Sequence, residues 1–422
     1  MAEILSLNIQ SEIGELEGVI LHTPGAEVEN MTPGTAQRAL YSDILNLSIA
    51  KTEYDQLQGV LGKYTRTFQV TDLLEQVLAN YSQREMLIKK VCESEGALEY
   101  YEQLMAMPSA ELAKALIEGV PARKNTLTAF LSDEYYALYP LYNFYFTRDA
   151  SVTIGNNALI CRMANKVRMR ESLIMEAIFK GSGAFSGGII NAHEFQPGCN
   201  DIYMEGGDIL VAREDILVIG NGCRTSTRGI DMLIARLCRE HTQGTRHIIV
   251  QQLPSQPESF IHLDMVFTLL DRDKCMVYEP LVLRDNQYQT VHITIEDGKV
   301  SKIRSIPTIL HALRELGMDL EPIACGGSSD EWNQEREQWH SGANFFAIAP
   351  GKLLSYSRNV NTLGELSKHG FEIIPAWDVI HGKADITGDK LCVVTIDGSE
   401  FPRGGGGARC MTMPLSRNAV EW

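Results

Sequence analysis

Residues 150–162 read ASVTIGNNALICR, and this segment predicts two short strands joined by a tight polar turn. Segments of the same kind recur along the chain: DILVAREDILVIGNG (208–222), MVFTLLDRDKCMVYEP (265–280) and NFFAIAPGKLLSYSRN (344–359). Helical patterns follow several of them, such as MRESLIMEAIFK and RGIDMLIARLCRE. The sequence therefore predicts a protein built from repeated units of one hairpin and one helix.

A polar residue introduces each of the first three hairpins at nearly constant spacing. Asp149 and Glu205 are 56 residues apart, and Glu205 and His262 are 57 apart. A recurring unit of this size predicts modules around an axis, each of which delivers one side chain to a shared centre. The alternative is an ordinary α/β sheet, but single parallel strands do not alternate with helices in this sequence.

The length of the chain and its changes in pattern predict its domain organisation. A chain of 422 residues is usual for two units, or for one core with an insertion. The apolar run GVILHTPG (18–25) predicts the first strand. We expect one catalytic α/β domain over residues 1–422, with a small helical insertion at 71–136.

Two segments of the predicted insertion have apolar residues at helical spacing. TDLLEQVLANYSQREMLIKKVCES begins at Thr71, and Thr71 or Asp72 is the expected N-cap. PSAELAKALIEG has Ser109 as its expected cap and Gly119 as its stop.

Composition and charge exclude several classes of function. The formal net charge of −16 argues against nucleic-acid binding, which depends on clustered lysine and arginine. The first residues lack a basic region followed by a long apolar one, and no apolar run is long enough to span a bilayer. The nine cysteines are odd in number and scattered, without a CxxC pair, which fits a reducing compartment. We expect a cytoplasmic protein without a nucleic-acid or membrane partner.

Four segments carry residues suited to chemistry: NFYFTRD (143–149), EGGD (205–208), HLD (262–264) and RGGGGARC (403–410). If residues 262–264 form a strand, His262 and Asp264 point to the same face and can share a ligand. Each of the first three segments also has a plain structural interpretation. These are a salt bridge in NFYFTRD, a surface turn in EGGD and a partly buried histidine beside a turn-capping aspartate in HLD.

The glycine-rich segment carries the strongest signal. Four consecutive glycines, Gly404 to Gly407, are costly to order and need a reason. Cys410 follows them with Arg409 beside it, and such a loop is typical of cysteines whose thiolate is favoured. A flexible loop with a buried cysteine is the plain alternative.

Together the four segments supply a thiol, a histidine and several carboxylates. This set suits a cationic electrophile better than an acyl group, whose reaction needs donors aimed at an oxyanion. A guanidinium is planar and pairs with carboxylates in a bidentate manner. The residues therefore indicate a guanidine substrate.

In these motifs and their order the chain resembles the arginine deiminases of the guanidine-modifying (pentein) superfamily. The resemblance runs nearly end to end and is carried by NFYFTRD, the arginines of VRMRES, EGGD, GCRTS, HLDMVFTLLDRD, EQWHSGANFFAIAPG and RCMTMPL. It implies a five-bladed, pseudo-symmetric α/β propeller of ββαβ modules with a helical insertion. It also implies an enzyme that hydrolyses free L-arginine to L-citrulline and ammonia, with neither a metal ion nor an organic cofactor.

The resemblance further implies a role for each matching residue. Cys410 would attack the guanidinium carbon, and His262 would protonate the departing ammonia and later deprotonate a water. Asp149 and Asp264 would hold the guanidinium nitrogens, while Glu205 supports the substrate and His262. The positions that match those binding the α-carboxylate, or flanking the aliphatic stem of the substrate, are Asn143, Arg168, Arg224 and Phe146.

The sequence departs from the family pattern at one position. Members usually carry an arginine five residues before the cysteine, where this chain has Gly405. In the family that arginine gates the empty site, whose carboxylates repel one another. We expect Arg403 or Arg409 to serve as the gate here, or the gate to be absent, and an altered substrate preference is a further alternative.

Three alternative functions follow from the same residues. Related enzymes transfer the amidino group or remove both nitrogens, and either reaction gives ornithine. A metal hydrolase would use His262, Asp264, Glu205 and Cys410 as ligands, although the usual ligand spacings are missing. A silent binding protein could share the fold. In each case we expect a homo-oligomer.

Overall fold

The first predicted hairpin opens a repeated set of sheets in the computed structural model. Strand β6 (Ser151–Ile154) pairs antiparallel with β7 (Asn157–Ile160), and Gly155 turns the chain between them with a φ of +58°, which glycine adopts without strain. Helix α10 (Met169–Gly181) then returns the chain to β9 (Gly188–Asn191), which pairs parallel with β7. The unit therefore has the order strand, strand, helix, strand.

The same order recurs in other sheets: an antiparallel pair, then a connection that contains a helix, then a parallel third strand. Within residues 4–36, 38–41, 43–195, 199, 201–240 and 242–422, which the structure describes, four more sheets follow it. Their strands are β10 (Ile209–Arg213), β11 (Ile216–Asn221) and β12 (Thr245–Gln252); β13 (Phe267–Asp271), β14 (Lys274–Val277) and β17 (Glu321–Ala324); β18 (Phe346–Ala349), β19 (Lys352–Tyr356) and β21 (Cys392–Ile396); and β22 (Met413–Arg417), β2 (Leu16–Leu21) and β3 (Arg66–Gln69).

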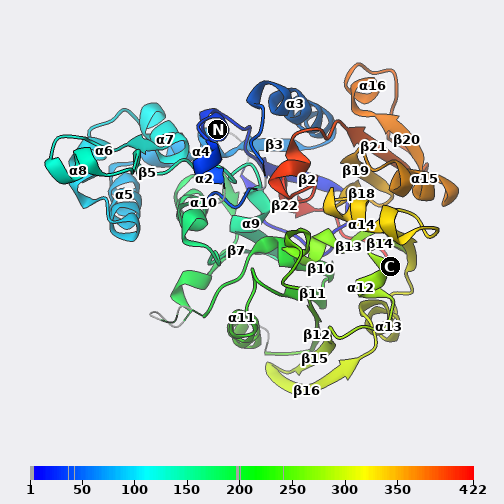
Figure 1. The fold of residues 1–422 in the computed structure, drawn as a ribbon. Helices are drawn as coiled ribbons and strands as arrows, with labels where there is room; N and C mark the ends of the chain where they lie inside the picture. The colour runs from blue at the N-terminus through cyan, green and yellow to red at the C-terminus, as the bar shows by residue number, and fades with distance from the viewer. Residues whose placement is uncertain (1–3, 37, 42, 196–198, 200, 241) are drawn as a thin grey trace.

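The last of these sheets joins the two ends of the chain, because β22 pairs antiparallel with β2. Figure 1 shows the sheets following one another around the middle of the molecule, with helices outside. Two sheets carry additions: β15 (Thr290–Glu296) and β16 (Lys299–Ile306) extend the sheet of β12, and β20 (Glu372–Pro375) lies beside β21. The architecture is mixed α/β, and no helix in the described ranges is long and apolar enough to cross a membrane.

The helices cover the sheets with amphipathic faces. In α11 (Thr227–Glu240) the buried residues Ile230, Leu233, Ile234 and Leu237 recur at intervals of three and four, so they form one stripe against the sheet. Burying each such side chain stabilises the fold by about 1.5–3 kcal/mol. The helices outside the 71–136 segment also include α1 (Ala26–Glu29), α2 (Pro33–Ala36), α3 (Leu47–Tyr64), α9 (Thr147–Ala150), α12 (Glu279–Val282), α13 (Ile309–Glu315), α14 (Glu331–Trp339), α15 (Val360–Lys368) and α16 (Ala376–Ile380).

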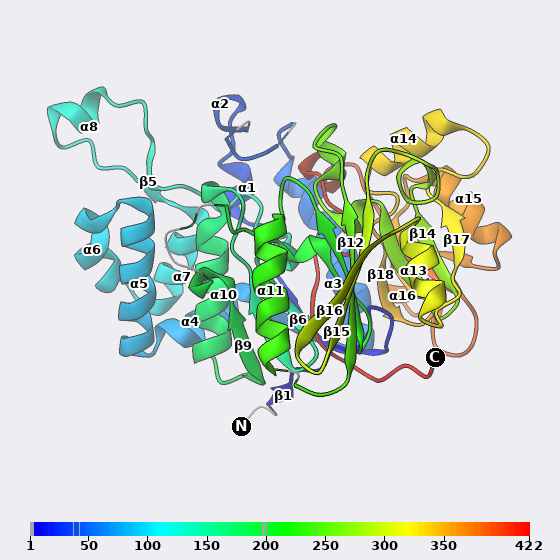
Figure 2. The ribbon, with the colours of Figure 1, turned by 90° about the horizontal axis from the view of Figure 1, so that it is seen from below.

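The segment predicted to be helical lies at one side of the molecule (Figures 1 and 2). Its helices are α4 (Val70–Leu78), α5 (Tyr81–Glu95), α6 (Tyr101–Met105), α7 (Ser109–Glu118) and α8 (Leu127–Leu131). The long pattern from residue 71 is interrupted, because Asn80 caps α5 through its side chain.

Two of the three predicted helix ends in this segment differ from the structure. Helix α4 begins at Val70, so Thr71 and Asp72 lie inside it and Gln69 is the N-cap. Pro108 takes the N-cap position of α7, so Ser109 is its first residue; proline cannot donate a backbone hydrogen bond, which costs nothing at a helix start. The stop at Gly119 is confirmed, with a φ of +98°.

Candidate active site

Three candidate side chains lie directly before three successive hairpins. Asp149 belongs to the short helix α9, which leads into β6. Glu205 and His262 are the N-cap residues of two single 3₁₀ turns, each followed by a hairpin. The predicted strand at residues 262–264 is wrong, because the chain turns after His262, and Asp264 lies within the turn. The spacing of the three residues nevertheless brings them to one place.

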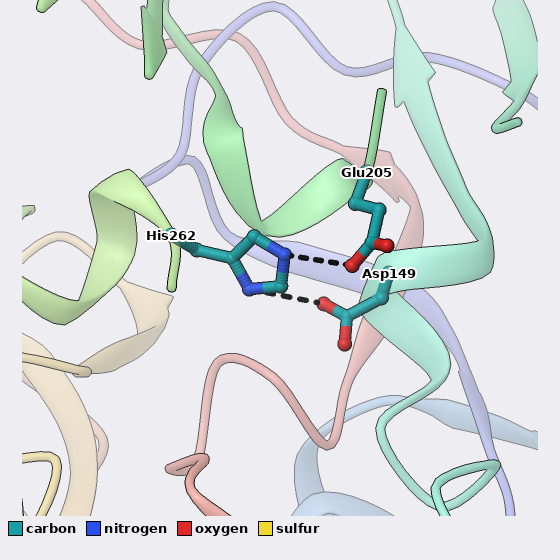
Figure 3. Close-up of side chains that lie close together, drawn as sticks. All are labelled: Asp149, Glu205 and His262. Atoms are coloured by element: carbon teal, nitrogen blue, oxygen red, sulfur yellow. Dashed lines mark hydrogen bonds and ion pairs between the residues drawn. The ribbon is translucent and has the colours of Figure 1, made fainter. Parts of the chain in front are cut away.

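The three side chains converge in the interior (Figure 3). Nε2 of His262 lies 3.0 Å from Oε2 of Glu205, and Nδ1 lies 3.7 Å from Oδ1 of Asp149. All three side chains are buried. Gly207 permits this approach, because a Cβ there would lie 2.5 Å from Nδ1 of His262.

Two arginines complete this group. Nη1 of Arg168 lies 2.7 Å from Oδ2 of Asp149 and 3.8 Å from Oε2 of Glu205. Nη1 of Arg224 lies 3.6 Å from Oε1 of Glu205. Arg168 also donates two hydrogen bonds to the buried Glu171, through Nε and Nη2. We call Asp149, Glu205, His262 and Arg168, with Arg224 at its edge, the His262 cluster.

Electrostatics in the His262 cluster favour a charged histidine. Burial by itself lowers the pKa of His262, but the carboxylates of Asp149 and Glu205 raise it to about 9. Burial raises the pKa of Glu205, yet Arg224, His262 and Arg168 lower it to about 2. At neutral pH the imidazole therefore carries a proton that it can donate.

Cys410 lies in a second buried group. Its Sγ is 3.7 Å from Oδ2 and 3.9 Å from Oδ1 of Asp264. Nη1 of Arg409 binds Asp264 at 2.7 Å, and the rest of its guanidinium binds Glu12 in a bidentate manner at 3.0 and 3.1 Å. We call Cys410, Asp264, Arg409 and Glu12 the Cys410 cluster.

The expectation that the glycine loop favours a thiolate does not hold in this state of the protein. Burial raises the pKa of Cys410 well above its usual value, and the carboxylates of Asp264 and Asp149 raise it further. Arg409 offsets this only partly, because its charge is engaged by Asp264 and Glu12. The resting site therefore combines a neutral thiol with a charged imidazole.

One cavity of about 270 Å³ connects the two clusters, a size suited to a small metabolite. Residues missed from the sequence also line it, including Leu40, Tyr41 and the loop 255–261. Their position follows from the fold and not from any motif. The predicted site residues that line the cavity are Asn143, Phe146, Asp149, Arg168, Arg224, His262, Arg403 and Cys410. Glu205, Asp264 and Arg409 lie behind this surface.

The two candidate gate residues have different surroundings. Arg403 is exposed at the cavity and its Nη1 binds Asp43 at 2.8 Å. Arg409 is 1% exposed and enclosed by its partners. Gly405 has a φ of +81°, so the loop takes a conformation that an arginine at this position would adopt only with strain. The carboxylates of the site are neutralised instead by Arg168 and Arg409.

The donor atoms also bear on the metal alternative. Ligand atoms of Asp149, Glu205 and His262 lie within 4.8 Å of one another, whereas Asp264 and Cys410 form no such group with them among the described residues. The four-ligand set expected for a metal hydrolase is therefore wrong. The two carboxylates among the remaining donors, Asp149 and Glu205, already face Arg168 and Arg224.

Known proteins resemble this chain in sequence and in fold. A family described as arginine deiminase matches residues 37–417. An arginine deiminase of Bacillus cytotoxicus is 31% identical over 98% of this chain and 99% of its own length. One of Oenococcus oeni is 30% identical over 100% of both chains.

Two solved structures share the fold at low sequence identity. The product-bound N-terminal domain of ArgZ, an arginine dihydrolase of cyanobacteria, has a TM-score of 0.51 at 13% identity and covers 96% of this chain and 100% of that chain. SxtG, an amidinotransferase from Microseira wollei, has a TM-score of 0.51 at 13% identity and covers 98% of each chain.

Proposed function

This chain belongs to the arginine deiminase family, and we propose that it uses Cys410 and His262 to hydrolyse free L-arginine to L-citrulline and ammonia. Membership makes it a hydrolase of C–N bonds in linear amidines. The observation that supports this use of the site is the single cavity shared by a thiol, a charged imidazole and Asp149.

The carboxylates suit a guanidinium substrate. Oδ2 of Asp149 accepts a hydrogen bond from the guanidinium of Arg168 at 2.7 Å, so this carboxylate already binds the chemical group that the substrate carries. We expect the substrate to replace Arg168 at Asp149. Arg168 then keeps Glu171 as its partner and is free to turn toward the substrate's α-carboxylate.

Binding of the substrate also activates the thiol. The cationic guanidinium lies between Asp149 and Cys410, where its charge opposes the effect of the nearby carboxylates on sulfur. The thiol then passes its proton to bulk water, and the thiolate Sγ attacks the guanidinium carbon, which forms the C–S bond and a neutral tetrahedral adduct. The carboxylates of Asp149 and Asp264 stabilise this adduct once His262 has protonated its departing nitrogen and made it cationic.

His262 moves the protons. In the charged form favoured by its pKa of about 9 it donates a proton to the departing nitrogen, and ammonia leaves a covalent thiouronium on Cys410. The neutral imidazole then takes a proton from water, whose oxygen attacks the same carbon. The C–S bond breaks, the proton of the added hydroxyl passes to the departing sulfur and restores the thiol, and citrulline is released.

The other end of the cavity suits an amino acid. Asn143, Arg168 and Arg224 line it and offer donors for a carboxylate, while Phe146 offers an apolar surface for the aliphatic stem. Two cations favour free arginine over agmatine or a peptide. Arg403 is the gate candidate that reaches the cavity.

Formation of ornithine is the alternative outcome, by dihydrolysis or amidino transfer. The fold is shared with an arginine dihydrolase and an amidinotransferase, so fold alone does not separate these reactions. The products separate them, because deimination gives citrulline and either alternative gives ornithine.

We also propose that the five sheets form the blades of a pseudo-symmetric propeller within one domain, 1–422, that carries the 71–136 insertion. Their common strand order and the closing pair of β22 with β2 support this.

We further propose a cytoplasmic homo-oligomer. The scattered cysteines fit a reducing compartment. Leu127, Phe130, Leu131 and Tyr135 on the projecting α8 arm are each at least 69% exposed, which supports contact with a second copy.

The test is product analysis of the purified protein with L-arginine, with and without a chelator. We expect equal amounts of citrulline and ammonia in both conditions, and loss of turnover in Cys410→Ala. Cys238→Ala, which changes a cysteine on α11, is the matched control and keeps full activity. Ornithine as the product would contradict the proposed reaction, and full activity in Cys410→Ala would contradict the proposed nucleophile.

A further inference from the structure

A buried asparagine lies against the proposed nucleophile. Asn344 is 1% exposed and precedes β18, so a different module from that of Cys410 positions it. Its Nδ2 lies 3.2 Å from Sγ of Cys410. It does not line the cavity, so it can affect the reaction only through its neighbours.

The chemistry of its neighbours fixes the orientation of the Asn344 amide. Oδ1 accepts hydrogen bonds from the backbone N–H groups of Arg409, at 2.9 Å, and Cys410, at 3.2 Å. A backbone N–H can only donate, so the carbonyl oxygen must face these two groups. Nδ2 therefore points to the other side, where it meets acceptors: Sγ of Cys410, the backbone oxygen of Asp264 at 3.2 Å and the sulfur of Met265 at 3.7 Å.

The glycine loop is shaped around this side chain. A Cβ on Gly407 would lie 2.7 Å from both Cβ and Oδ1 of Asn344. That separation is too short for any real contact, so a side chain at position 407 would displace the amide. One of the four consecutive glycines thus has a defined purpose, which is to let Asn344 reach the backbone of Cys410.

We propose that Asn344 is a positioning residue that fixes Cys410 for attack and donates a hydrogen bond to its sulfur when the sulfur carries negative charge. The carboxylate of Asp264 lies 3.7 Å from the same sulfur and opposes that charge. The N–H of the Asn344 amide, 3.2 Å from the sulfur, compensates without adding a charge that would repel a cationic substrate. This inference rests on Cys410 as the nucleophile, as proposed above.

The test measures the sulfur directly and does not depend on turnover of arginine. The rate of Cys410 alkylation by iodoacetamide is followed by peptide mass spectrometry from pH 6 to 10, because the thiolate is the reactive form. In Asn344→Asp the oxygen that accepts from the backbone is kept, while the donor next to sulfur is replaced by a carboxylate oxygen. We expect alkylation at pH 8 to fall by about tenfold or more, which corresponds to a thiol pKa raised by about one unit.

Asn359→Asp is the matched control. Asn359 is also 1% exposed, and its Nδ2 donates to a backbone oxygen, that of His340, at 3.1 Å, but it does not contact Cys410. We expect this variant to keep the wild-type alkylation profile. An equal change in both variants would show a general effect of a buried carboxylate and would overturn the proposal.

Asn344→Ser provides a second variant if Asn344→Asp does not fold. Serine is smaller, introduces no charge and removes the amide donor from sulfur. We expect a shift in the same direction and a fall in kcat that exceeds the change in KM. A wild-type alkylation profile in either folded variant would overturn the role of Asn344, whatever the effect on turnover. Absence of citrulline formation by the wild-type protein, with Cys410 alkylated normally, would instead contradict the proposed reaction.

Discussion

The two halves of the site use the same pair of groups, a buried carboxylate and an arginine, in opposite ways. In the His262 cluster Asp149 and its partner Arg168 both line the cavity, so a ligand can replace the arginine. In the Cys410 cluster Asp264 and Arg409 lie behind the surface of the cavity. In the proposed mechanism, access from the cavity, and not residue type, separates the pair that would bind substrate from the pair that would hold the nucleophile in place.

The second carboxylate in each half shows the same contrast. Burial raises the pKa of Glu171 to about 7 despite its bond to Arg168, so only about half of this group is charged near pH 7. Burial also raises the pKa of Glu12, but Arg409 and Arg148 outweigh it and lower the value to about 2. Glu12 therefore stays charged at neutral pH, whereas Glu171 takes up a proton readily.

Removing Arg409 from the Cys410 cluster gives the largest effect that we expect on stability. Arg409→Gln leaves Glu12 and Asp264 buried without their cation, which costs about 3–5 kcal/mol of unfolding free energy. Urea denaturation followed by circular dichroism measures this loss. In Arg168→Gln the loss is smaller, because Glu171 can take up a proton.

Two variants check this comparison. Arg314→Gln at an exposed ion pair, where the arginine side chain is 65% exposed, should change little. Adding Glu12→Gln to Arg409→Gln should restore part of the lost stability. Equal losses in Arg409→Gln and Arg168→Gln would remove the distinction between the two halves.

The next effect concerns pH. Burial raises the pKa of Asp208 from 3.8 to about 7, and Oδ1 accepts a hydrogen bond from the N–H of Leu263 at 2.9 Å. Between these pKa values the unfolded chain loses the proton that the folded one keeps, so stability falls as pH rises and levels off above pH 7. Asp208→Asn removes this loss and should stabilise the protein at pH 8 by about 2–4 kcal/mol, with little difference near pH 4.

Denaturation at several pH values tests this prediction. Asp133→Asn, at an exposed aspartate, is the control and should show no such pH-dependent gain. A gain in Asp208→Asn that is the same at pH 4 and pH 8 would contradict a raised pKa in the folded state.

The smallest effect concerns the glycine loop itself. Gly405→Ala forces a φ of +81° on a residue with a Cβ, although nothing lies within 4 Å of that position, so the cost is backbone strain alone, about 1 kcal/mol. Gly62→Ala is the matched control, because Gly62 is exposed in α3 with nothing within 4 Å. It should stabilise the protein by about 0.5–1 kcal/mol. A shift in thermal midpoint of the same sign in both variants would show that the loop is not strained.

Much of the fold could be predicted because its signals are local. The sequence predicts the hairpins at 150–162 and 208–222 from strand patterns, in which side chains alternate every two residues. It predicts helix α11 from apolar residues that recur every three to four. Both patterns depend only on near neighbours. The spacing of Asp149, Glu205 and His262 also predicted a shared centre. Helix starts were predicted less accurately: α4 begins at Val70, one residue before Thr71, and Pro108 rather than Ser109 takes the N-cap position of α7.

The sequence by itself determined which residues are candidates for the chemistry: a cysteine after a glycine run, a histidine and the acids that suit a guanidinium. Only the tertiary structure decided how they are used. Glu12 and Arg409 are 397 residues apart, and Asn344 is 66 residues from Cys410, so no local pattern links them. The pKa of each group depends on burial and on charges that such distant segments bring together, and for this reason the thiol is neutral where the loop alone indicated a thiolate.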